Sequence, residues 1–434
     1  MTDTLQKLNI KQLNPMQLAS LEANKKNNDV ILLAPTGSGK TLAFLLPLLS
    51  IIKPQEKGIQ VLIIAPAREL AIQIEQVFKS MQTGFKVNCC YGGHSTKTER
   101  DNLLEAPTVL IATPGRLCHH IRKKTVELQS VETIIIDEFD KCLEFGFNDD
   151  MAFIVYQLTH LKKRILTSAT NNLELPSFLE MPKAVSLNYF NDAVTPSKLK
   201  VQLVNTLHAE KLETLLQLVA SIGAKPMLIF CNHRDAVDRI SDTLYKKGLA
   251  HDVFHGGLEQ DERERAIIKF RNKSCYVLIA TDLAARGLDI PEIDSVIHYQ
   301  LPINEESFVH RNGRTARMHA NGVAYVLLSN EEKLPTFIPK NIETKELKNN
   351  AISFEQPVWK TLYMSAGKKE KINKIDIVGF LAQKGKLTKE EIGIIQVLDH
   401  SAYVAIATSK AEQVVKQVAN EKIKNQKVKI VIAM

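Results

Sequence analysis

The chain has 434 residues, enough for two or three domains. Its hydrophobic fraction of 44% and charged fraction of 24% are ordinary for a globular protein, and no apolar run reaches the roughly 20 residues that span a bilayer. The N-terminus has no signal-peptide pattern and the six cysteines have no metal-ligand spacing. We therefore expect a cytoplasmic protein with free thiols and no membrane partner.

Short apolar runs alternate with helix-length segments in the first part of the chain. Such runs are typical of strands that helices cover on both faces, and the alternation predicts right-handed βαβ units in a parallel sheet. Ligands of these sheets bind beyond the carboxyl ends of the strands. The predicted strands are Val30–Leu33, Val61–Ile64, Val109–Ile111, Thr133–Ile136 and Ile165–Leu166.

The segment Ala34–Thr41 lies between the first predicted strand and an apolar run that reads as a helix. Its glycines let backbone N–H groups converge on phosphate oxygens, and the helix N-terminus adds a partial positive charge. Lys40 can reach the terminal phosphates and the Thr41 hydroxyl can hold Mg²⁺. An ordinary glycine-rich turn is the alternative. The predicted triphosphate-binding residues are Thr36, Gly37, Ser38, Gly39, Lys40 and Thr41.

Two carboxylates follow the predicted strand Thr133–Ile136. Asp137 would hold Mg²⁺, partly through water, and Glu138 would orient or deprotonate an attacking water molecule. An acidic loop that caps a strand is the alternative. Because a phosphate loop lies about 100 residues upstream, the pair predicts hydrolysis of a nucleoside triphosphate.

The alternating pattern pauses at about residues 182–200 and then resumes, which predicts a second parallel sheet. Its predicted strands are Met227–Phe230, Val277–Ile279, Val296–Ile297 and Val323–Leu328. A linker without periodicity follows at about residues 331–357. The last segment reads β-α-β-β-α-β. Its predicted elements are Lys360–Met364, Ile375–Leu381, Ile392–Leu398, Ala402–Ala407, Ala411–Val418 and Val428–Ile432.

The predicted fold class is therefore α/β, with two parallel-sheet domains in tandem and a small α+β domain at the C-terminus. We place the domains at residues 1–190, 200–335 and 356–434. Residues 351–434 contain 14 Lys, no Arg and 8 acidic residues, and so carry most of the formal net charge of +8. Either a solvated lysine-rich surface or a module that binds a polyanion would account for this composition.

From about residue 14 to 317 the chain resembles the DEAD-box RNA helicases. The motifs that carry the resemblance are Asn14–Gln17, Ala34–Thr41, Pro66–Leu70, Gly92-Gly93, Thr113–Arg116, Asp137–Asp140, Ser168–Thr170, Ile229–Asn232, Gln260 with Arg263, Ala280–Asp289 and His310–Arg317. The sequence departs from the family pattern at Ala67, where Thr is usual, at Phe139, where Ala is usual, and at Asn312, where Ile is usual. Ala316 likewise replaces a usual Gly.

The resemblance implies two RecA-like domains that bind ATP and Mg²⁺ and close over RNA. Gln17 would read adenine, and Gly287 and Asp289 would add nucleotide contacts. Arg314 and Arg317 would act as arginine fingers beside Lys40, Asp137 and Glu138. The implied coupling residues are Ser168, Ala169, Thr170, Asp140 and His310. The implied RNA contacts in the core are Arg68, Gly93, Thr113, Arg116, Gly257 and Thr281.

The C-terminal segment resembles the RNA-binding domain of the DbpA branch of this family, on Thr361–Lys371, Ile392–Asp399 and Tyr403–Ala405. The resemblance implies an RRM-like sheet that binds a hairpin of large-subunit ribosomal RNA. We expect RNA contacts from Lys368, Lys369, Tyr363 and Tyr403, although core packing is an equally good reading of the two tyrosines.

The resemblance implies an ATP-dependent RNA helicase that remodels structured RNA, most simply ribosomal RNA during large-subunit assembly, without an obligate protein partner. A general helicase acting on messenger RNA is one alternative. An RNA clamp with little turnover is another, suggested by the departures at Ala67, Phe139 and Asn312. A DNA-translocating ATPase on the same two domains is a third, against which the RNA-type motifs argue.

Overall fold

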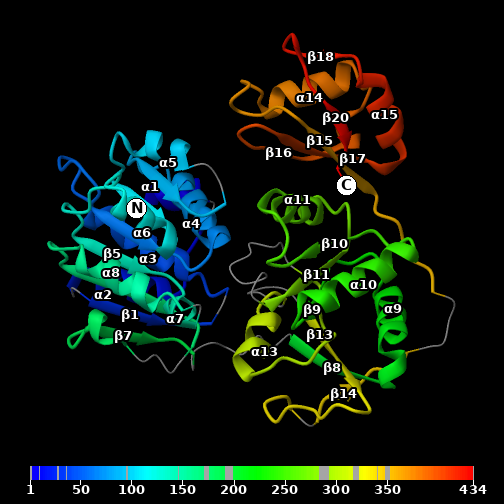
Figure 1. Ribbon diagram of the computed structural model, residues 1–434, viewed down its shortest axis with the longest axis horizontal. Helices are drawn as coiled ribbons and strands as arrows, with labels where there is room; N and C mark the ends of the chain where they lie inside the picture. The colour runs from blue at the N-terminus through cyan, green and yellow to red at the C-terminus, as the bar shows by residue number, and fades with distance from the viewer. Residues whose placement is uncertain are drawn as a thin grey trace. The chain divides into compact units, whose positions relative to one another are not determined.

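The computed structural model describes residues 2–8, 10–26, 29–35, 37–93, 96–144, 146–170, 175–190, 199–282, 293–315, 322–339, 341–347 and 352–433. The chain forms two compact units, with the boundary near residue 198. The first unit contains a seven-stranded parallel sheet. The second contains another seven-stranded parallel sheet and a four-stranded antiparallel sheet (Figure 1). The predicted fold class is confirmed.

The first sheet has the strand order β3-β4-β2-β5-β6-β1-β7, and every pair is parallel. Its strands are β1 (Asp29–Leu33), β2 (Val61–Ile64), β3 (Val87–Cys90), β4 (Val109–Ala112), β5 (Thr133–Ile136), β6 (Lys163–Ser168) and β7 (Val185–Asn188). Its helices are α1 (Thr2–Lys7), α2 (Pro15–Lys26), α3 (Lys40–Ile51), α4 (Arg68–Ser80), α5 (Thr96–Leu103), α6 (Pro114–Arg122), α7 (Phe139–Glu144) and α8 (Asn148–Tyr156).

The apolar strands of this sheet feed two separate cores. In β2, Leu62 and Ile64 pack into one hydrophobic cluster, whereas Val61 and Ile63 pack into the other. Successive side chains of a strand point to opposite faces, so a run without polar residues requires helices on both. The five predicted strands are confirmed. The edge strands β3 and β7 were not predicted, because both are short and neither is a continuous apolar run.

The second parallel sheet has the order β10-β11-β9-β12-β13-β8-β14. Its strands are β8 (Leu199–Thr206), β9 (Met227–Cys231), β10 (His251–Phe254), β11 (Val277–Thr281), β12 (Ser295–His298), β13 (Gly322–Ser329) and β14 (Glu343–Thr344), and its helices are α9 (Lys211–Ile222), α10 (Arg234–Lys246), α11 (Gln260–Arg271) and α13 (Glu305–Asn312). The four predicted strands are confirmed. The sequence did not predict β8, β10 or β14, which lie toward the sheet edges and carry polar residues.

The C-terminal domain has the strand order β16-β17-β15-β20, all antiparallel. Its elements are β15 (Trp359–Met364), α14 (Lys374–Gln383), β16 (Ile392–Val397), β17 (Ala402–Ala407), α15 (Ala411–Val418) and β20 (Ile430–Ile432), with a small hairpin of β18 (Lys422–Ile423) and β19 (Gln426–Lys427). The predicted β-α-β-β-α-β order is confirmed. Among the described helices, none combines the length and the apolar composition that a bilayer span requires.

Candidate nucleotide and RNA sites

The phosphate loop joins β1 to α3. Gly37 and Gly39 have φ of 82° and 90°, in the left-handed region that residues with a Cβ rarely adopt. Lys40 is the first residue of α3. Its ammonium group points back into the loop and donates to the carbonyl oxygens of Ala34 at 2.5 Å and Pro35 at 3.2 Å. The loop therefore presents a cation and a helix N-terminus at the carboxyl end of β1, the combination that binds phosphate.

Gln17 links the predicted adenine-reading motif to this loop. Its Nε2 donates to the carbonyl oxygen of Gly39 at 3.3 Å, and its Oε1 accepts from the backbone N–H of Asn14 at 3.1 Å. The Asn14 side chain in turn donates to the carbonyl oxygen of Ser38 at 2.9 Å. A Cβ on Gly39 would come within 2.7 Å of the Gln17 amide. Gln17 and the loop therefore act as one packed unit.

The acidic pair follows β5, as predicted. Asp137 is buried, and its Oδ1 accepts from the Thr167 hydroxyl at 2.5 Å and from the Glu138 N–H at 3.1 Å. Burial raises the pKa of the Asp137 carboxyl, while the hydrogen bond from Thr167 and the charge of Lys40 oppose that rise. Lys40 and Asp137 therefore belong to one electrostatic environment.

Glu138 has a φ of 47°, an unusual conformation for a residue with a side chain. Its backbone N–H is fixed by two acceptors, Asp137 Oδ1 and Thr167 Oγ1, each at 3.1 Å. Backbone strain of this kind costs of order 1–3 kcal/mol and persists where the surroundings enforce it, often at functional sites. The strained backbone and its two hydrogen bonds determine the direction in which the Glu138 carboxylate leaves the chain.

Phe139 occupies the position where the family usually has alanine. Its side chain is completely buried in one of the two cores of the first sheet, in the cluster that also contains Ile136, Cys142 and Leu166. The ring is therefore a core residue, so the departure at this position is a packing change.

The predicted coupling residues lie at the ends of neighbouring strands. Ser168 ends β6, and its Oγ accepts from the Thr170 backbone N–H at 3.0 Å and lies 2.9 Å from the Thr170 hydroxyl. Ala169 is buried between them, and Asp140 lies in the first turn of α7. Among the described residues, no hydrogen bond joins Asp140 to Ser168 or Thr170.

The first unit brings several predicted RNA contacts to one edge of its sheet. The Arg68 guanidinium lies over the Tyr91 ring, 4.5 Å from its centroid, beside Gly92-Gly93. Thr113 is the N-cap of α6, and its N–H donates to the Cys90 carbonyl oxygen at 3.0 Å. Arg116, in the first turn of α6, pairs with Glu99 at 3.4 Å. Three separate motifs thus converge on the carboxyl ends of β3 and β4.

Ala67 is the N-cap residue of α4, and it has no side chain able to accept a hydrogen bond there. The threonine usual at this position could supply that bond, and its loss typically costs about 1 kcal/mol. The departure thus affects the stability of the helix that carries Arg68, and Arg68 itself is retained.

In the second unit, Arg311 is the centre of a buried polar network. Its Nε and Nη2 donate to the two carboxylate oxygens of Asp282, at 2.6 and 2.7 Å. It also donates to Asn232 Oδ1 and to the Gln300 carbonyl oxygen, each at 2.7 Å. Asp282, Asn232 and Arg311 come from three of the sequence motifs. Their pairing is evident only in the folded chain, so no role could be predicted for them from the sequence.

Asn312 has a partner in this network. Its Oδ1 lies 2.9 Å from His298 Nε2, and His298 Nδ1 lies 3.5 Å from Arg311 Nη1. The amide oxygen can only accept a hydrogen bond, so the Nε2 that faces it must carry the proton. The guanidinium can only donate, so the Nδ1 that faces it must be unprotonated. Burial, and then the charge of Arg311, lower the pKa of His298 to about 3. Asn312 therefore fixes a neutral tautomer of His298.

Because His298 is buried, we expect the free energy of unfolding to fall in acid. The folded pKa of about 3 lies below the ordinary value near 6.5, so the unfolded chain takes up a proton in this window that the folded chain does not. This contribution to the free energy of unfolding is fully present above pH 6.5. It falls by up to about 1.4 kcal/mol per pH unit as the pH drops toward 3.

Urea unfolding followed at pH 7, 6, 5 and 4 measures this effect. We expect the His298→Asn variant to lose less stability than the parent protein between pH 6.5 and 4. The matched control is His160→Asn, because His160 is exposed. Equal slopes for the parent protein and His298→Asn would contradict the assignment.

The structure describes four more of the predicted residues, all in the second unit. His310 lies in α13, and Arg314 follows that helix. Thr281 ends β11, and the Gly257 N–H donates to His255 Nδ1 at 3.1 Å in the turn after β10. Four predicted residues lie outside the described part of the chain: Thr36, Gly287, Asp289 and Arg317.

Lysines cluster on one loop of the C-terminal domain, between β15 and α14. Lys368 and Lys369 are exposed, and their backbone N–H groups donate to the carbonyl oxygens of Leu398 and Asp399. A Cβ on Gly367 would lie 2.2 Å from the Leu398 carbonyl oxygen, so this loop must begin with glycine. The fixed backbone presents the two ammonium groups outward.

Tyr363 and Tyr403 lie opposite each other on β15 and β17, with ring centroids 5.5 Å apart. Tyr403 is 6% exposed and packs with Ile268 of α11, from the neighbouring parallel-sheet domain. Asn272 Nδ2 donates to the Thr361 hydroxyl at 3.0 Å in the same contact. Burial raises the pKa of Tyr403 to about 12. Tyr403 is thus packed, whereas Tyr363 is half-buried.

Three family models match successive parts of the chain: DEAD/DEAH box helicase at residues 14–176, Helicase conserved C-terminal domain at 210–319, and DbpA RNA binding domain at 361–432. The chain is 32% identical to the ATP-dependent RNA helicase DbpA of Escherichia coli, over 97% of this chain and 94% of that protein. It is 29% identical to the Bacillus subtilis protein of the same name, over 96% and 93%.

Solved structures agree on the fold. Dbp5 of S. cerevisiae bound to RNA and ADP BeF3 is 24% identical with a TM-score of 0.67, over 76% of this chain and 86% of that one. Mss116p bound to ssRNA and AMP-PNP has the same identity and TM-score, over 76% and 72%. Together with the relative that is 32% identical over nearly the whole chain, the matches show that the chain belongs to the DEAD-box family of ATP-dependent RNA helicases.

Proposed function

We propose that this helicase remodels structured ribosomal RNA during assembly of the large ribosomal subunit, in the cytoplasm. The observation that carries the proposal is the C-terminal domain. Its RRM-like strand order, its exposed lysine loop and its match to the DbpA RNA binding domain occur together in residues 361–432. An RRM-like domain gives the helicase core a means of selecting its RNA.

The nucleotide would bind at the phosphate loop, with Lys40 on the terminal phosphates and Gln17 on adenine. Mg²⁺ would be held by Thr41 and Asp137. The donor set fits this hard cation, because hydroxyl and carboxylate oxygens are its usual ligands. Within the described part of the chain, the hydrogen bonds donated to the Asp137 carboxylate use Oδ1. The cation would supply charge neutralisation at the transferring phosphoryl group. Glu138 would orient the attacking water molecule, and Arg314 and Arg317 would stabilise developing charge.

The RNA backbone would lie along Arg68, Gly93, Thr113 and Arg116 of the first unit and Gly257 and Thr281 of the second. Contacts of this type fix register without reading sequence. Selection would come from the C-terminal lysine loop, Lys368 and Lys369 with the neighbouring Lys371 and Lys374, all of them exposed. Because lysine is a point charge, we expect this binding to weaken steeply with salt.

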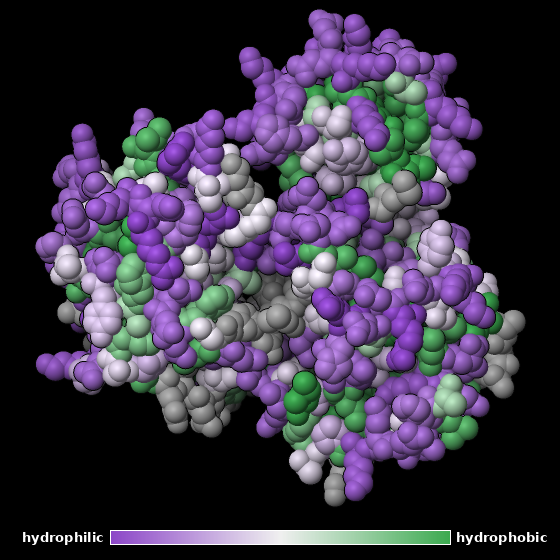
Figure 2. All heavy atoms as spheres, in the orientation of Figure 1, coloured by the Kyte–Doolittle hydropathy of each residue, from purple (hydrophilic) through white to green (hydrophobic). Residues whose placement is uncertain are grey.

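On the face drawn in Figure 2, hydrophilic side chains cover the outer part of the C-terminal domain around β18. Lys424, between β18 and β19, donates to the Lys371 carbonyl oxygen at 2.9 Å and pairs with Asp376 at 2.7 Å. The β18–β19 hairpin is thereby attached to the lysine loop. Tyr363 would contribute a partly accessible ring beside the packed Tyr403.

Crosslinking of the full-length protein to RNA in cells, followed by sequencing, tests the proposal. We expect a dominant peak on one hairpin of large-subunit ribosomal RNA. Neutralising the loop in Lys368→Gln/Lys369→Gln/Lys371→Gln will remove that peak. The matched control, Lys410→Gln/Lys416→Gln, removes lysines of the same domain outside this loop and will keep it.

Two other outcomes correspond to the alternatives. Scattered messenger-RNA peaks that persist in the triple variant would contradict a ribosomal target and favour general remodelling. A ribosomal peak from a protein without RNA-stimulated ATP turnover would indicate a clamp.

A further inference from the structure

We propose that Glu99 is a positioning residue for RNA binding, holding the three RNA-contact motifs of the first unit in register. The proposal rests on the RNA roles assigned above to Arg68, Gly93 and Arg116. Glu99 lies on α5, between the motifs, and belongs to none of them. It is 2% exposed, so its carboxylate is directed into the protein.

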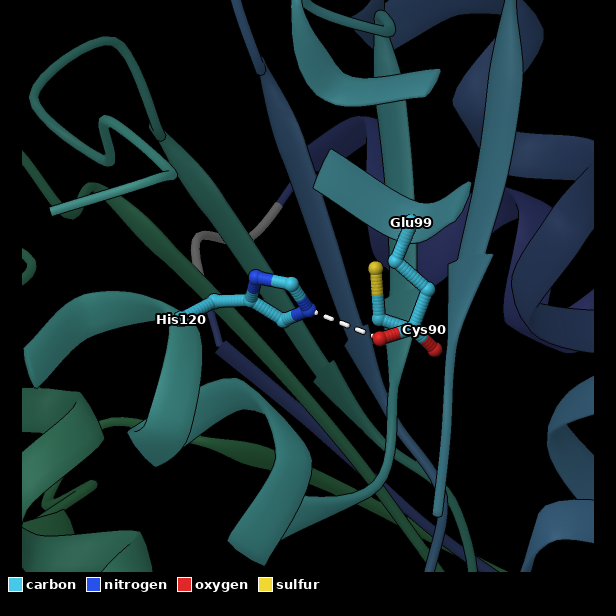
Figure 3. A group of neighbouring side chains, drawn as sticks. All are labelled: Cys90, Glu99 and His120. Carbon is cyan, nitrogen blue, oxygen red and sulfur yellow. Dashed lines mark hydrogen bonds and ion pairs between the residues drawn. The ribbon is translucent and has the colours of Figure 1, made fainter. Parts of the chain in front are cut away.

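The Glu99 carboxylate is the meeting point of three donors. Its Oε1 accepts from the Tyr91 backbone N–H at 2.9 Å. Its Oε2 lies 2.8 Å from His120 Nε2, and 3.4 Å from Arg116 Nη1. Figure 3 shows the glutamate reaching from its helix toward the His120 ring, with the Cys90 side chain beside it. Hydrogen bonds of this kind, with an ionised acceptor, are roughly twice as strong as neutral ones.

Two of these donors, Tyr91 and Arg116, belong to different parts of the predicted RNA surface. Tyr91 precedes Gly92-Gly93. The Arg68 guanidinium lies over the Tyr91 ring, 4.5 Å from its centroid. Arg116 is part of the motif that Thr113 begins, so its pairing with Glu99 determines where the guanidinium points. One carboxylate therefore sets the backbone position before the glycine pair and the direction of a basic side chain.

His120 strengthens this arrangement from α6. It follows Arg116 by four residues, one helical turn, so the two side chains lie on the same face and meet the same carboxylate. His120 Nδ1 lies 2.7 Å from the Thr125 hydroxyl, which fixes the ring from its other side. The histidine thus holds the carboxylate in place. The Arg116 side chain, which shares that carboxylate, is still 12% exposed.

Cys90, Glu99 and His120 also place possible metal-ligand atoms within 4.8 Å of one another. The surroundings favour hydrogen bonding over a metal site. Both Glu99 oxygens already have donors, Oε1 from the Tyr91 N–H and Oε2 from His120 and Arg116. Arg116 already supplies positive charge at Glu99.

Glu99→Gln tests the proposal, because glutamine keeps the shape and an oxygen acceptor for the Tyr91 N–H but loses the charge. In steady-state ATPase assays with single-stranded RNA, we expect the KM for RNA to rise about tenfold, the worth of one charge-assisted hydrogen bond. We expect kcat at saturating RNA and the KM for ATP to stay within about twofold. Circular dichroism and thermal unfolding establish that the variant is folded.

Two further variants keep the result interpretable. Asp29→Asn is the matched control, because it removes a carboxylate that accepts from Arg164 at the other end of the same sheet, and we expect it to leave the KM for RNA unchanged. Thr125→Val releases the His120 ring without touching Glu99. We expect it to raise the KM for RNA in the same direction but by less.

An unchanged KM for RNA in both Glu99→Gln and Thr125→Val would overturn the proposal. So would a matched fall in kcat at saturating RNA and in ATP affinity, which would indicate general destabilisation. If the parent protein showed no RNA-stimulated turnover, it would be the proposed helicase cycle that failed, and direct RNA binding by Glu99→Gln would then test the positioning role separately.

Discussion

Replacing Glu138 with glutamine is expected to lower RNA-stimulated ATP hydrolysis by about 10²- to 10⁴-fold, the usual worth of a positioned general base. The amide cannot accept a proton from water, yet it has nearly the same shape as the carboxylate. Because Asp137 and Lys40 are unchanged, binding of ATP and of RNA should be retained. The backbone geometry should also persist, since the hydrogen bonds that hold Glu138 use its N–H group.

Single-turnover ATPase assays, combined with fluorescent-nucleotide titration, separate chemistry from binding. The matched control is Glu132→Gln, just before β5, which removes a surface carboxylate paired with Lys162. We expect turnover of this control to equal that of the parent protein. Retention of substantial turnover in Glu138→Gln would show that another group orients the water molecule. Loss of nucleotide binding would show that Glu138 instead supports the phosphate site.

The central strands of both parallel sheets could be predicted because they are buried on both faces. In β2 and β5 every residue but one is aliphatic, and this pattern is specific enough to predict a strand without further context. Edge strands face water on one side and have no such requirement. The strand β14 contains only Glu343 and Thr344, and it exists because it pairs with β8.

The same contrast holds for the sites. Residues that act through local geometry, such as those of the phosphate loop, follow from neighbouring residues in the sequence. In the Glu99 network the bonded residues are 8 to 21 positions apart, and the partner at 8 positions is a backbone N–H. In the His298 network they are 13 and 14 positions apart. No local pattern indicates such pairs. The sequence showed Asn312 only as a departure from the family pattern, and the histidine that it contacts explains it.

Replacing Arg311 with alanine is expected to have the largest effect on stability. The side chain is 1% exposed, and its removal leaves the Asp282 carboxylate, 18% exposed, without its bidentate partner. Breaking a buried ion pair on one side costs about 3–5 kcal/mol, because the remaining charge stays poorly solvated. Arg311→Lys keeps the charge but cannot donate to both carboxylate oxygens and to two further acceptors at once, so it should recover only part of the loss.

Urea unfolding with hydrogen exchange on β9, β11 and β12 measures the effect where the network lies. The matched control is Arg234→Met, whose exposed pair with Asp235 should be worth less than about 1 kcal/mol. The double variant Arg311→Ala/Asp282→Asn removes both charges, so we expect it to be more stable than Arg311→Ala alone. If the double variant lost the full sum of the single effects, the two residues would be acting independently. The motifs around β9, β11 and α13 would then not share a common electrostatic anchor.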